Sequence, residues 1–175
     1  MDKTEARQLV VQAVRESPKF DYQALVTRLC QSLFWRRART IAITLSAGKE
    51  IRTDPIIHKA WSQRKTVAVP KTFPHGQMHF YRLLPQTPLK KNRFGIREPV
   101  DAMLVKKPAI NLIIVPGVAF TVPGHDRLGW GGGYYDRYLK GYSGCTVALA
   151  RPQQIFKAPI WPVSSNDVKV QQIIS

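Results

Sequence analysis

The stretch from Val115 to Leu139, VPGVAFTVPGHDRLGWGGGYYDRYL, holds the residues best suited to bind an anionic ligand. Five of the chain's 11 glycines lie within residues 124–133, and glycine lets backbone amides approach a ligand closely. Arg127 and Asp136 lie at the two ends of the densest part of this segment and carry opposite charges. A helix that began near Gly132 would present free N–H groups to a phosphate. The sequence therefore predicts an anion-binding loop.

Several motifs with known chemistry are absent from the sequence. There is no G-x-x-x-x-G-K-[ST] loop, and the GWGGG run at 129–133 does not follow the G-x-G-x-x-G spacing. There is also no G-x-S-x-G elbow and no C-x-x-C pair, and the four histidines lack the spacing of a zinc site. From spacing alone, a strained turn explains the glycine-rich run as well as a ligand-binding loop does.

Carboxylates are scarce in the second part of the chain, which limits where a metal could bind. A magnesium ion in a protein usually takes one or two carboxylate ligands together with substrate phosphates and water. Only five carboxylates follow residue 54, namely Glu98, Asp101, Asp126, Asp136 and Asp167. Any magnesium site built on this part of the chain must draw on that short set.

The charge balance is unusual, with 27 basic against 11 acidic residues and a net charge of +16. Such a field favours nucleic acid, but it also attracts small polyanionic substrates. The basic residues are spread along the chain, and the densest pairs are Arg36-Arg37 and Lys90-Lys91. A scattered excess is equally compatible with a solvated surface, so charge alone does not choose the partner.

Length and composition indicate an ordinary globular protein. A chain of 175 residues, 44% of them hydrophobic, is long enough for one domain with its own core, and we expect a single domain over 1–175 and a monomer. No apolar run approaches the roughly 20 residues of a membrane span, and residues 1–10 lack the apolar core of a signal peptide. We expect a cytoplasmic protein whose Cys30 and Cys145 stay reduced.

Hydrophobic periodicity predicts alternating helices and strands. The helical spacings cover residues 2–16, residues 21–34, a helix capped by Thr53, and a helix from about Gly132 to Tyr142. Short apolar or β-branched runs predict strands at 40–45, 66–69, 110–115, 145–150 and 168–174. The alternating residues 78–83 predict an edge or antiparallel strand, and the proline-rich residues 85–109 predict mostly loop.

This alternation predicts an α/β fold with a three-layer, mostly parallel twisted sheet covered by helices on both faces, similar to a Rossmann fold. In such folds ligands bind beyond the carboxyl ends of the strands. Three polar segments follow predicted strands: Ser46–Glu50, Pro116–Gly133 and Arg151–Gln154. We expect these segments to form one edge of a site.

The combination of several motifs resembles the 5-formyltetrahydrofolate cyclo-ligase family, also called methenyltetrahydrofolate synthetase. The resemblance spans nearly the whole chain in order, and its most specific part is VPGVAF followed by RLGWGGGYYDRYL. The other matching features are Lys3 with Arg7, Glu50 with Thr53, the FYRL segment at 80–83, and Asn92-x-Phe94-Gly95-Ile96-x-Glu98-Pro99.

The resemblance implies an enzyme that uses ATP and Mg²⁺ to convert 5-formyltetrahydrofolate to 5,10-methenyltetrahydrofolate, with release of ADP and phosphate. It implies that the residues acting in catalysis are Lys3, Arg127 and Asp136, and that the magnesium ligands are Asp136 and Asp167. The implied ATP-binding residues are Lys3, Arg7, Arg127, Leu128, Gly129, Trp130, Gly131, Gly132, Gly133, Tyr134 and Tyr135. The implied folate-binding residues are Leu45, Glu50, Trp130, Gly131, Gly132, Gly133 and Tyr134, and Gln154 matches a family glutamine.

The sequence also departs from the family pattern. The family usually carries an aspartate after the Ala-Phe pair, where this chain has Thr121, and acidic residues where it has Arg52 and Gln171. These departures leave one alternative open, a catalytically drifted relative that acts as a basic nucleic-acid-binding or interaction module. Folate and ATP are the expected partners, and nucleic acid is not, although the net charge leaves room for it.

Overall fold

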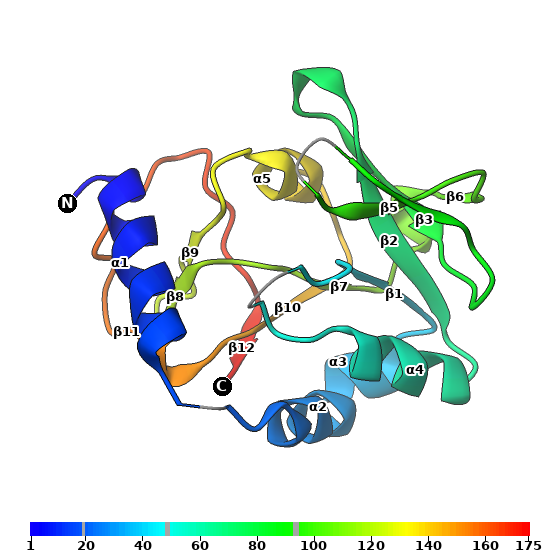
Figure 1. The fold of residues 1–175 in the computed structure, drawn as a ribbon, viewed down its shortest axis with the longest axis horizontal. Coiled ribbons are helices and arrows are strands. Elements are labelled where there is room, and N and C mark those ends of the chain that lie inside the picture. The colour runs from blue at the N-terminus through cyan, green and yellow to red at the C-terminus, as the bar shows by residue number, and fades with distance from the viewer. Residues whose placement is uncertain (19, 48–49, 93–94) are drawn as a thin grey trace.

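A seven-stranded sheet forms the centre of the computed structural model, which describes residues 1–175 except 19, 48–49 and 93–94 (Figure 1). Its strand order is β12-β10-β7-β1-β2-β3-β6. The first five strands of this order run parallel, and β3 and β6 are antiparallel to their neighbours. The strands are β1 (Thr40–Ile43), β2 (Thr66–Thr72), β3 (Met78–Arg82), β6 (Leu104–Val105), β7 (Leu112–Ile114), β10 (Cys145–Leu149) and β12 (Gln172–Ile174).

Helices cover both faces of this sheet because alternate strand residues point to opposite sides. In β1, Ile41 and Ile43 join the core beneath the helices α2 (Tyr22–Gln31), α3 (Leu33–Arg37) and α4 (Asp54–Ser62), whereas Ala42 joins the opposite core beneath α5 (Tyr134–Leu139). Figure 1 shows α2–α4 below the sheet and α5 above it. The predicted α/β architecture with a mixed, mostly parallel sheet is confirmed.

A second, smaller sheet lies between the central sheet and the helix α1 (Lys3–Glu16) (Figure 1). It consists of β8 (Ala119–Thr121), β9 (Arg127–Leu128) and β11 (Ile155–Phe156). Ala6 and Val10 of α1 pack against Leu128 and Trp161 in a third apolar cluster. This packing fixes the start of α1 near the glycine-rich segment.

As expected, more than half of the described residues in 85–109 lie outside helices and strands, but the segment also contains short elements that the sequence did not predict. These are the hairpin of β4 (Leu89–Lys91) and β5 (Arg97–Pro99), then β6 and a short 3-10 helix at Lys107–Ala109. Two further 3-10 turns cover Pro74–Gly76 and Pro152–Gln154. The buried carboxylate of Glu98 accepts from the Thr72 hydroxyl at 2.7 Å and so ties this hairpin to β2. The motif residue Phe94 lies outside the described residues.

Three helix predictions need correction. The helix predicted at 21–34 breaks at Ser32, whose extended backbone (ψ 148) and capping hydroxyl end α2 and start α3. The helix predicted from Gly132 to Tyr142 covers only six residues, because Gly133 at φ 64 is left-handed. Thr53 precedes α4 as predicted, but its hydroxyl does not cap the helix. It accepts the backbone N–H of Ser46 at 2.9 Å, and no N–H group of α4 donates to it.

Candidate functional site

The three polar segments predicted to form a site do follow neighbouring strands. The strands β10, β7 and β1 are adjacent and parallel, so their carboxyl ends meet at one edge of the sheet. The segment 116–133 follows β7, and the described parts of 46–50 and 151–154 follow β1 and β10. This edge also receives the start of α1 and the segment 164–170, through the contacts described next.

Arg127 and Asp136 form the central ion pair of the site. The Arg127 side chain is 3% exposed, and its Nη2 donates to Asp136 Oδ1 at 2.7 Å. Its Nη1 donates to the Pro116 carbonyl oxygen at 3.1 Å, while Nε is buried with no hydrogen-bond partner among the described residues. A buried guanidinium needs such pairing. The two contacts of Nη1 and Nη2 therefore set the orientation of the guanidinium group.

Lys3 and Asp167 form a second ion pair at the start of α1. The Lys3 ammonium lies 2.8 and 2.7 Å from the two carboxylate oxygens of Asp167. A capping box of Asp2 and Glu5 fixes the first turn that carries Lys3. Burial of Asp167 opposes its ionisation, but hydrogen bonds from Lys3 and Ser164 outweigh burial and keep its pKa below the usual value.

Arg7 connects α1 to the glycine-rich loop. Its Nε donates to the Gly129 carbonyl oxygen at 2.8 Å. Its guanidinium also lies against Gly131, where a Cβ atom would stand 3.6 Å from the guanidinium carbon, and φ is +109. Lys3 and Arg7 are four residues apart and so project from one face of α1. Arg7 therefore contacts the predicted loop directly, whereas Lys3 contacts Asp167.

The two predicted magnesium ligands lie close together. Asp136 Oδ1 accepts the backbone N–H of Val168 at 3.0 Å, and Val168 directly follows Asp167. Magnesium sites commonly use one or two carboxylates with substrate phosphates and water, and this pair fits that pattern. No cluster of three or more acidic, histidine or cysteine ligands occurs among the described residues.

Tyr135 and Glu50 are half-buried titratable groups of the site whose pKa values are both raised. Burial raises the pKa of the Tyr135 hydroxyl far above its usual value, so this group remains a neutral donor. The hydroxyl is buried without a partner within the described part of the chain, and the Arg127 guanidinium lies 6.0 Å from the ring centre. Burial also raises the pKa of Glu50, although the N–H of Ala47 lowers it.

The other residues predicted to bind ATP or folate differ in how much of their surface is exposed. Trp130 is 52% exposed, and Gly131 and Gly132 are exposed beside it. Gly129, Gly133 and Tyr134 are half-buried. The side chains of Leu45 and Leu128 are buried in apolar clusters, so only their backbone atoms are free to meet a ligand.

Gln154 has contacts that stabilise the fold around the site. Its Nε2 donates to the carbonyl oxygens of Gly117 and Val118 at 3.2 and 3.1 Å, and its Oε1 accepts the N–H of Arg151. The side chain thereby joins the end of β10 to the turn after β7.

A carboxylate that the family resemblance did not assign lies beside Thr121. The Thr121 hydroxyl donates to Asp126 Oδ2 at 2.9 Å and accepts the N–H of Asp126 at 2.9 Å. Lys169 pairs with Asp126 Oδ1 at 3.0 Å. Asp126 thus places a carboxylate next to the position where the family usually carries one. The sequence offered one signal for Asp126: it is one of only five carboxylates after residue 54, and it directly precedes Arg127.

Comparison with known proteins gives a consistent result. A model of the 5-formyltetrahydrofolate cyclo-ligase family matches residues 4–175. A 5-formyltetrahydrofolate cyclo-ligase of Haemophilus influenzae is 38% identical over 145 residues, which cover 77% of this chain and 77% of that protein. The protein of the same name from Escherichia coli is 38% identical over 145 residues, covering 79% and 78%.

A solved structure extends this similarity to the fold. The NMR structure of Aquifex aeolicus 5,10-methenyltetrahydrofolate synthetase matches with a TM-score of 0.84 and 27% sequence identity. The match covers 99% of this chain and 89% of that one. Separately, none of the helices in the described part of the chain has the length and apolar character needed to span a bilayer.

Proposed function

Because the chain belongs to the 5-formyltetrahydrofolate cyclo-ligase family, we propose that it converts 5-formyltetrahydrofolate to 5,10-methenyltetrahydrofolate. In this reaction ATP donates its terminal phosphoryl group to the formyl oxygen, and ADP and phosphate are released. A formamide is a poor electrophile, and its oxygen is a poor leaving group. Phosphorylation of that oxygen allows the second folate nitrogen to attack the carbon, after which phosphate departs with the oxygen.

The observation that carries this proposal is a set of four contacts, three of which join distant parts of the chain. Lys3 pairs with Asp167, Arg7 with Gly129, and Arg127 with Asp136. The N–H of Val168 completes the set by donating to Asp136. Every one of these contacts includes a residue that the family resemblance assigns to ATP or metal.

The basic residues supply the alignment and charge neutralisation that phosphoryl transfer mainly requires. We assign the ATP phosphates to Lys3, Arg7, Arg127 and the backbone amides of Gly129–Gly133. Arg127 donates to both Asp136 and Pro116, so the orientation of its guanidinium group is fixed. No protein nucleophile is needed for this reaction.

Asp136 and Asp167 are the proposed magnesium ligands. A bound magnesium ion would neutralise charge on the transferring phosphoryl group. Lys3 neutralises Asp167 in the ligand-free chain, and Arg127 does the same for Asp136. These ion pairs bring two carboxylates together with two cations at one place.

The folate lies, in this proposal, against Trp130, Gly131, Gly132 and Tyr134, with Glu50 hydrogen-bonded to its pterin. Trp130 offers an exposed aromatic face for such a ring. Glu50 is half-buried and accepts the N–H of Ala47 through Oε2, which leaves Oε1 for a hydrogen bond to a ring nitrogen. Leu45 contributes only backbone atoms.

An absorbance assay tests the proposal. The protein is mixed with 5-formyltetrahydrofolate, ATP and Mg²⁺, and the methenyl chromophore is followed, with each component omitted in turn. Chromophore should form only in the complete mixture. Arg127→Ala should abolish it, whereas Arg36→Ala, an exposed arginine of α3, should not. ATP hydrolysis without methenyl product would contradict the proposal.

A further inference from the structure

A basic cavity of about 440 Å³ lies on the side of α5 away from the Arg127–Asp136 pair. Three elements surround it: the tip of the β2–β3 hairpin, the segment from β6 to the following 3-10 helix, and α5. Its volume falls in the range of about 300–1,000 Å³ typical of small-molecule sites. The family resemblance assigns only one of its lining residues, Tyr134.

The cavity is lined by basic side chains. Lys106, Lys107, Arg137, His75 and His79 contribute to the wall, and no carboxylate lines it among the residues that the structure describes. Met78, Val105 and Tyr138 add apolar surface between the basic groups. Such a combination favours a ligand that carries several negative charges on a partly apolar chain.

Two of the cations are held in place before any ligand arrives. Arg137 Nη1 donates to the Gly132 carbonyl oxygen at 2.8 Å. Lys107 Nζ donates to the Lys140 carbonyl oxygen at 2.9 Å and lies 5.0 Å above the ring centre of Tyr138. Groups that are already ordered lose less conformational entropy when they bind an anion. The positions of these two cations therefore favour binding of a negatively charged group in the cavity.

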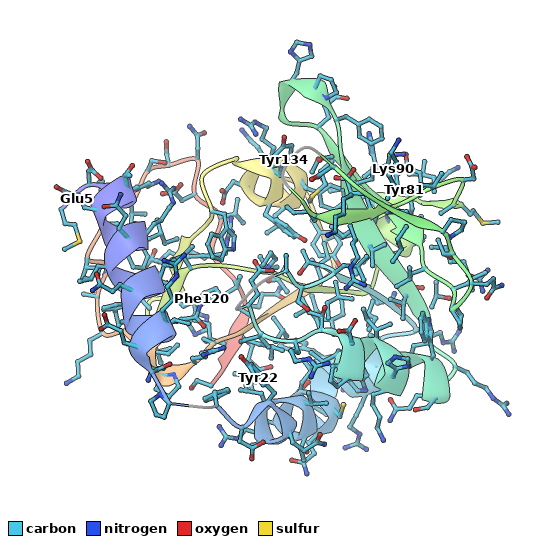
Figure 2. The ribbon with its side chains drawn as sticks, in the orientation of Figure 1. Glu5, Tyr22, Tyr81, Lys90, Phe120 and Tyr134 are labelled. Atoms are coloured by element: carbon cyan, nitrogen blue, oxygen red, sulfur yellow. The ribbon has the colours of Figure 1, made fainter. Side chains whose placement is uncertain are left out.

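The cavity and the proposed folate wall share Tyr134. On α5, Tyr134, Arg137 and Tyr138 lie three and four residues apart and share one face, and all three line the cavity. In Figure 2, Tyr134 is labelled on α5, and the strands β3 and β4, which carry Tyr81 and Lys90, lie to the right of this helix. A substrate lying against Tyr134 therefore has a basic cavity within reach of its far end.

We propose that this cavity binds the acidic tail of the folate substrate, in which every γ-linked glutamate keeps a free α-carboxylate and the last residue also has a free γ-carboxylate. This inference rests on the proposed function. Separate carboxylates on a flexible chain suit cations that come from three different elements. A compact triphosphate places its charges together and is better matched by Lys3, Arg7 and Arg127, whose contacts join α1, Gly129, Asp136 and Asp167.

Binding measured without ATP tests the proposal. Isothermal titration compares 5-formyltetrahydrofolate carrying one glutamate with the same compound carrying five γ-linked glutamates. We expect the longer tail to bind on the order of tenfold more tightly at low salt, since each exposed ion pair contributes a factor of a few. High salt should remove this advantage. The double variant Lys106→Ala/Lys107→Ala should lose most of it.

Lys59→Ala, an exposed lysine on α4, is the matched control and should keep the full advantage. Equal affinity for the two tail lengths would overturn the subsite while leaving the proposed function intact. Failure of either folate to bind would overturn both. If the double variant instead raised only the KM for ATP, the cavity would belong to the nucleotide and the proposal would be wrong.

Discussion

Thr121 stands where the resemblance led us to expect an aspartate, and the side chain of Asp126 lies directly beside it. Thr121 is fully buried, and Asp126 is nearly so. Two hydrogen bonds of 2.9 Å join them across the turn that leads into Arg127. Asp126 therefore places a carboxylate against Thr121 from the other side of the turn.

Thr121→Val should destabilise the protein, because it keeps the shape but removes the hydroxyl that satisfies two polar groups of Asp126. We expect a loss of about 1–3 kcal/mol in the free energy of unfolding, measured by urea denaturation. Thr121→Ser retains the hydroxyl and should lose much less. Equal stability of the valine and serine variants would show that the hydroxyl does not support Asp126.

The Lys3–Asp167 pair predicts a pH-dependent contribution to stability. Burial opposes ionisation of Asp167, but the bond from Lys3 prevails, so its pKa is lowered in the folded chain. A lowered pKa stabilises the fold above the unfolded-state value of about 3.9, and this gain is lost as pH falls through the folded-state value. Lys3→Met should thus cost about 1 kcal/mol at neutral pH and less below about pH 4.

Urea denaturation at several pH values measures this difference. Lys157→Met changes an exposed lysine elsewhere and should show no such trend. A destabilisation by Lys3→Met of the same size above and below the titration range of Asp167 would contradict the interpretation.

At the scale of elements, α1 brings its two cations to the site from the far end of the chain. It packs through Ala6 and Val10 on the small sheet, and Arg7 holds the Gly129 carbonyl oxygen. We expect Arg7→Met to raise the KM for ATP and to lower kcat/KM on the order of tenfold or more, the size expected for a charged hydrogen bond.

Steady-state kinetics with ATP varied at saturating folate gives both constants for this comparison. Arg15→Met changes an exposed arginine in the last turn of the same helix and serves as control. If Arg7→Met and Arg15→Met had the same kinetics, α1 would have a structural role only.

Elements within clear apolar or periodic runs were predictable from the sequence, and the small sheet was not. Periodic apolar residues indicated α1, β1 and β10 with bounds close to those observed. The small sheet was missed because its strands of two or three residues lie in segments rich in glycine and proline, whose composition indicates loop. Their pairing depends on contacts with α1, which residue patterns do not reveal.

The site itself was predictable only in part. The motif match indicated Lys3, Arg7, Arg127, Asp136 and Asp167, and the structure brings these five together. Periodicity could not indicate that the segment after Asp167 closes the site, since that depends on a single backbone hydrogen bond from Val168. The cavity beside Tyr134 was likewise hidden, because its basic residues come from three separate elements.

At the scale of the whole molecule, the net charge of +16 creates a field that attracts anions. ATP and a folate are both anionic, so this field should speed their capture. We expect kcat/KM for both substrates to fall several-fold between roughly 50 and 500 mM NaCl, because salt screens the field. Initial rates at several salt concentrations measure the effect, and salt-independent values would show that the charge does not steer the substrates.

The net positive charge is also compatible with the alternative function, binding of nucleic acid. That alternative predicts salt-sensitive binding of RNA or DNA together with no turnover of ATP. The site favours small anions, because Arg127 is buried, Lys3 and Arg7 are half-buried, and all three belong to one network of contacts with Asp167, Gly129 and Asp136.

The most direct test of phosphoryl activation follows the formyl oxygen itself. 5-Formyltetrahydrofolate labelled with ¹⁸O in the formyl group is converted with ATP and Mg²⁺, and the released phosphate is examined by mass spectrometry. Transfer of the phosphoryl group to that oxygen predicts one labelled oxygen in each phosphate formed with methenyl product. Unlabelled phosphate, with the label recovered in water, would contradict the mechanism.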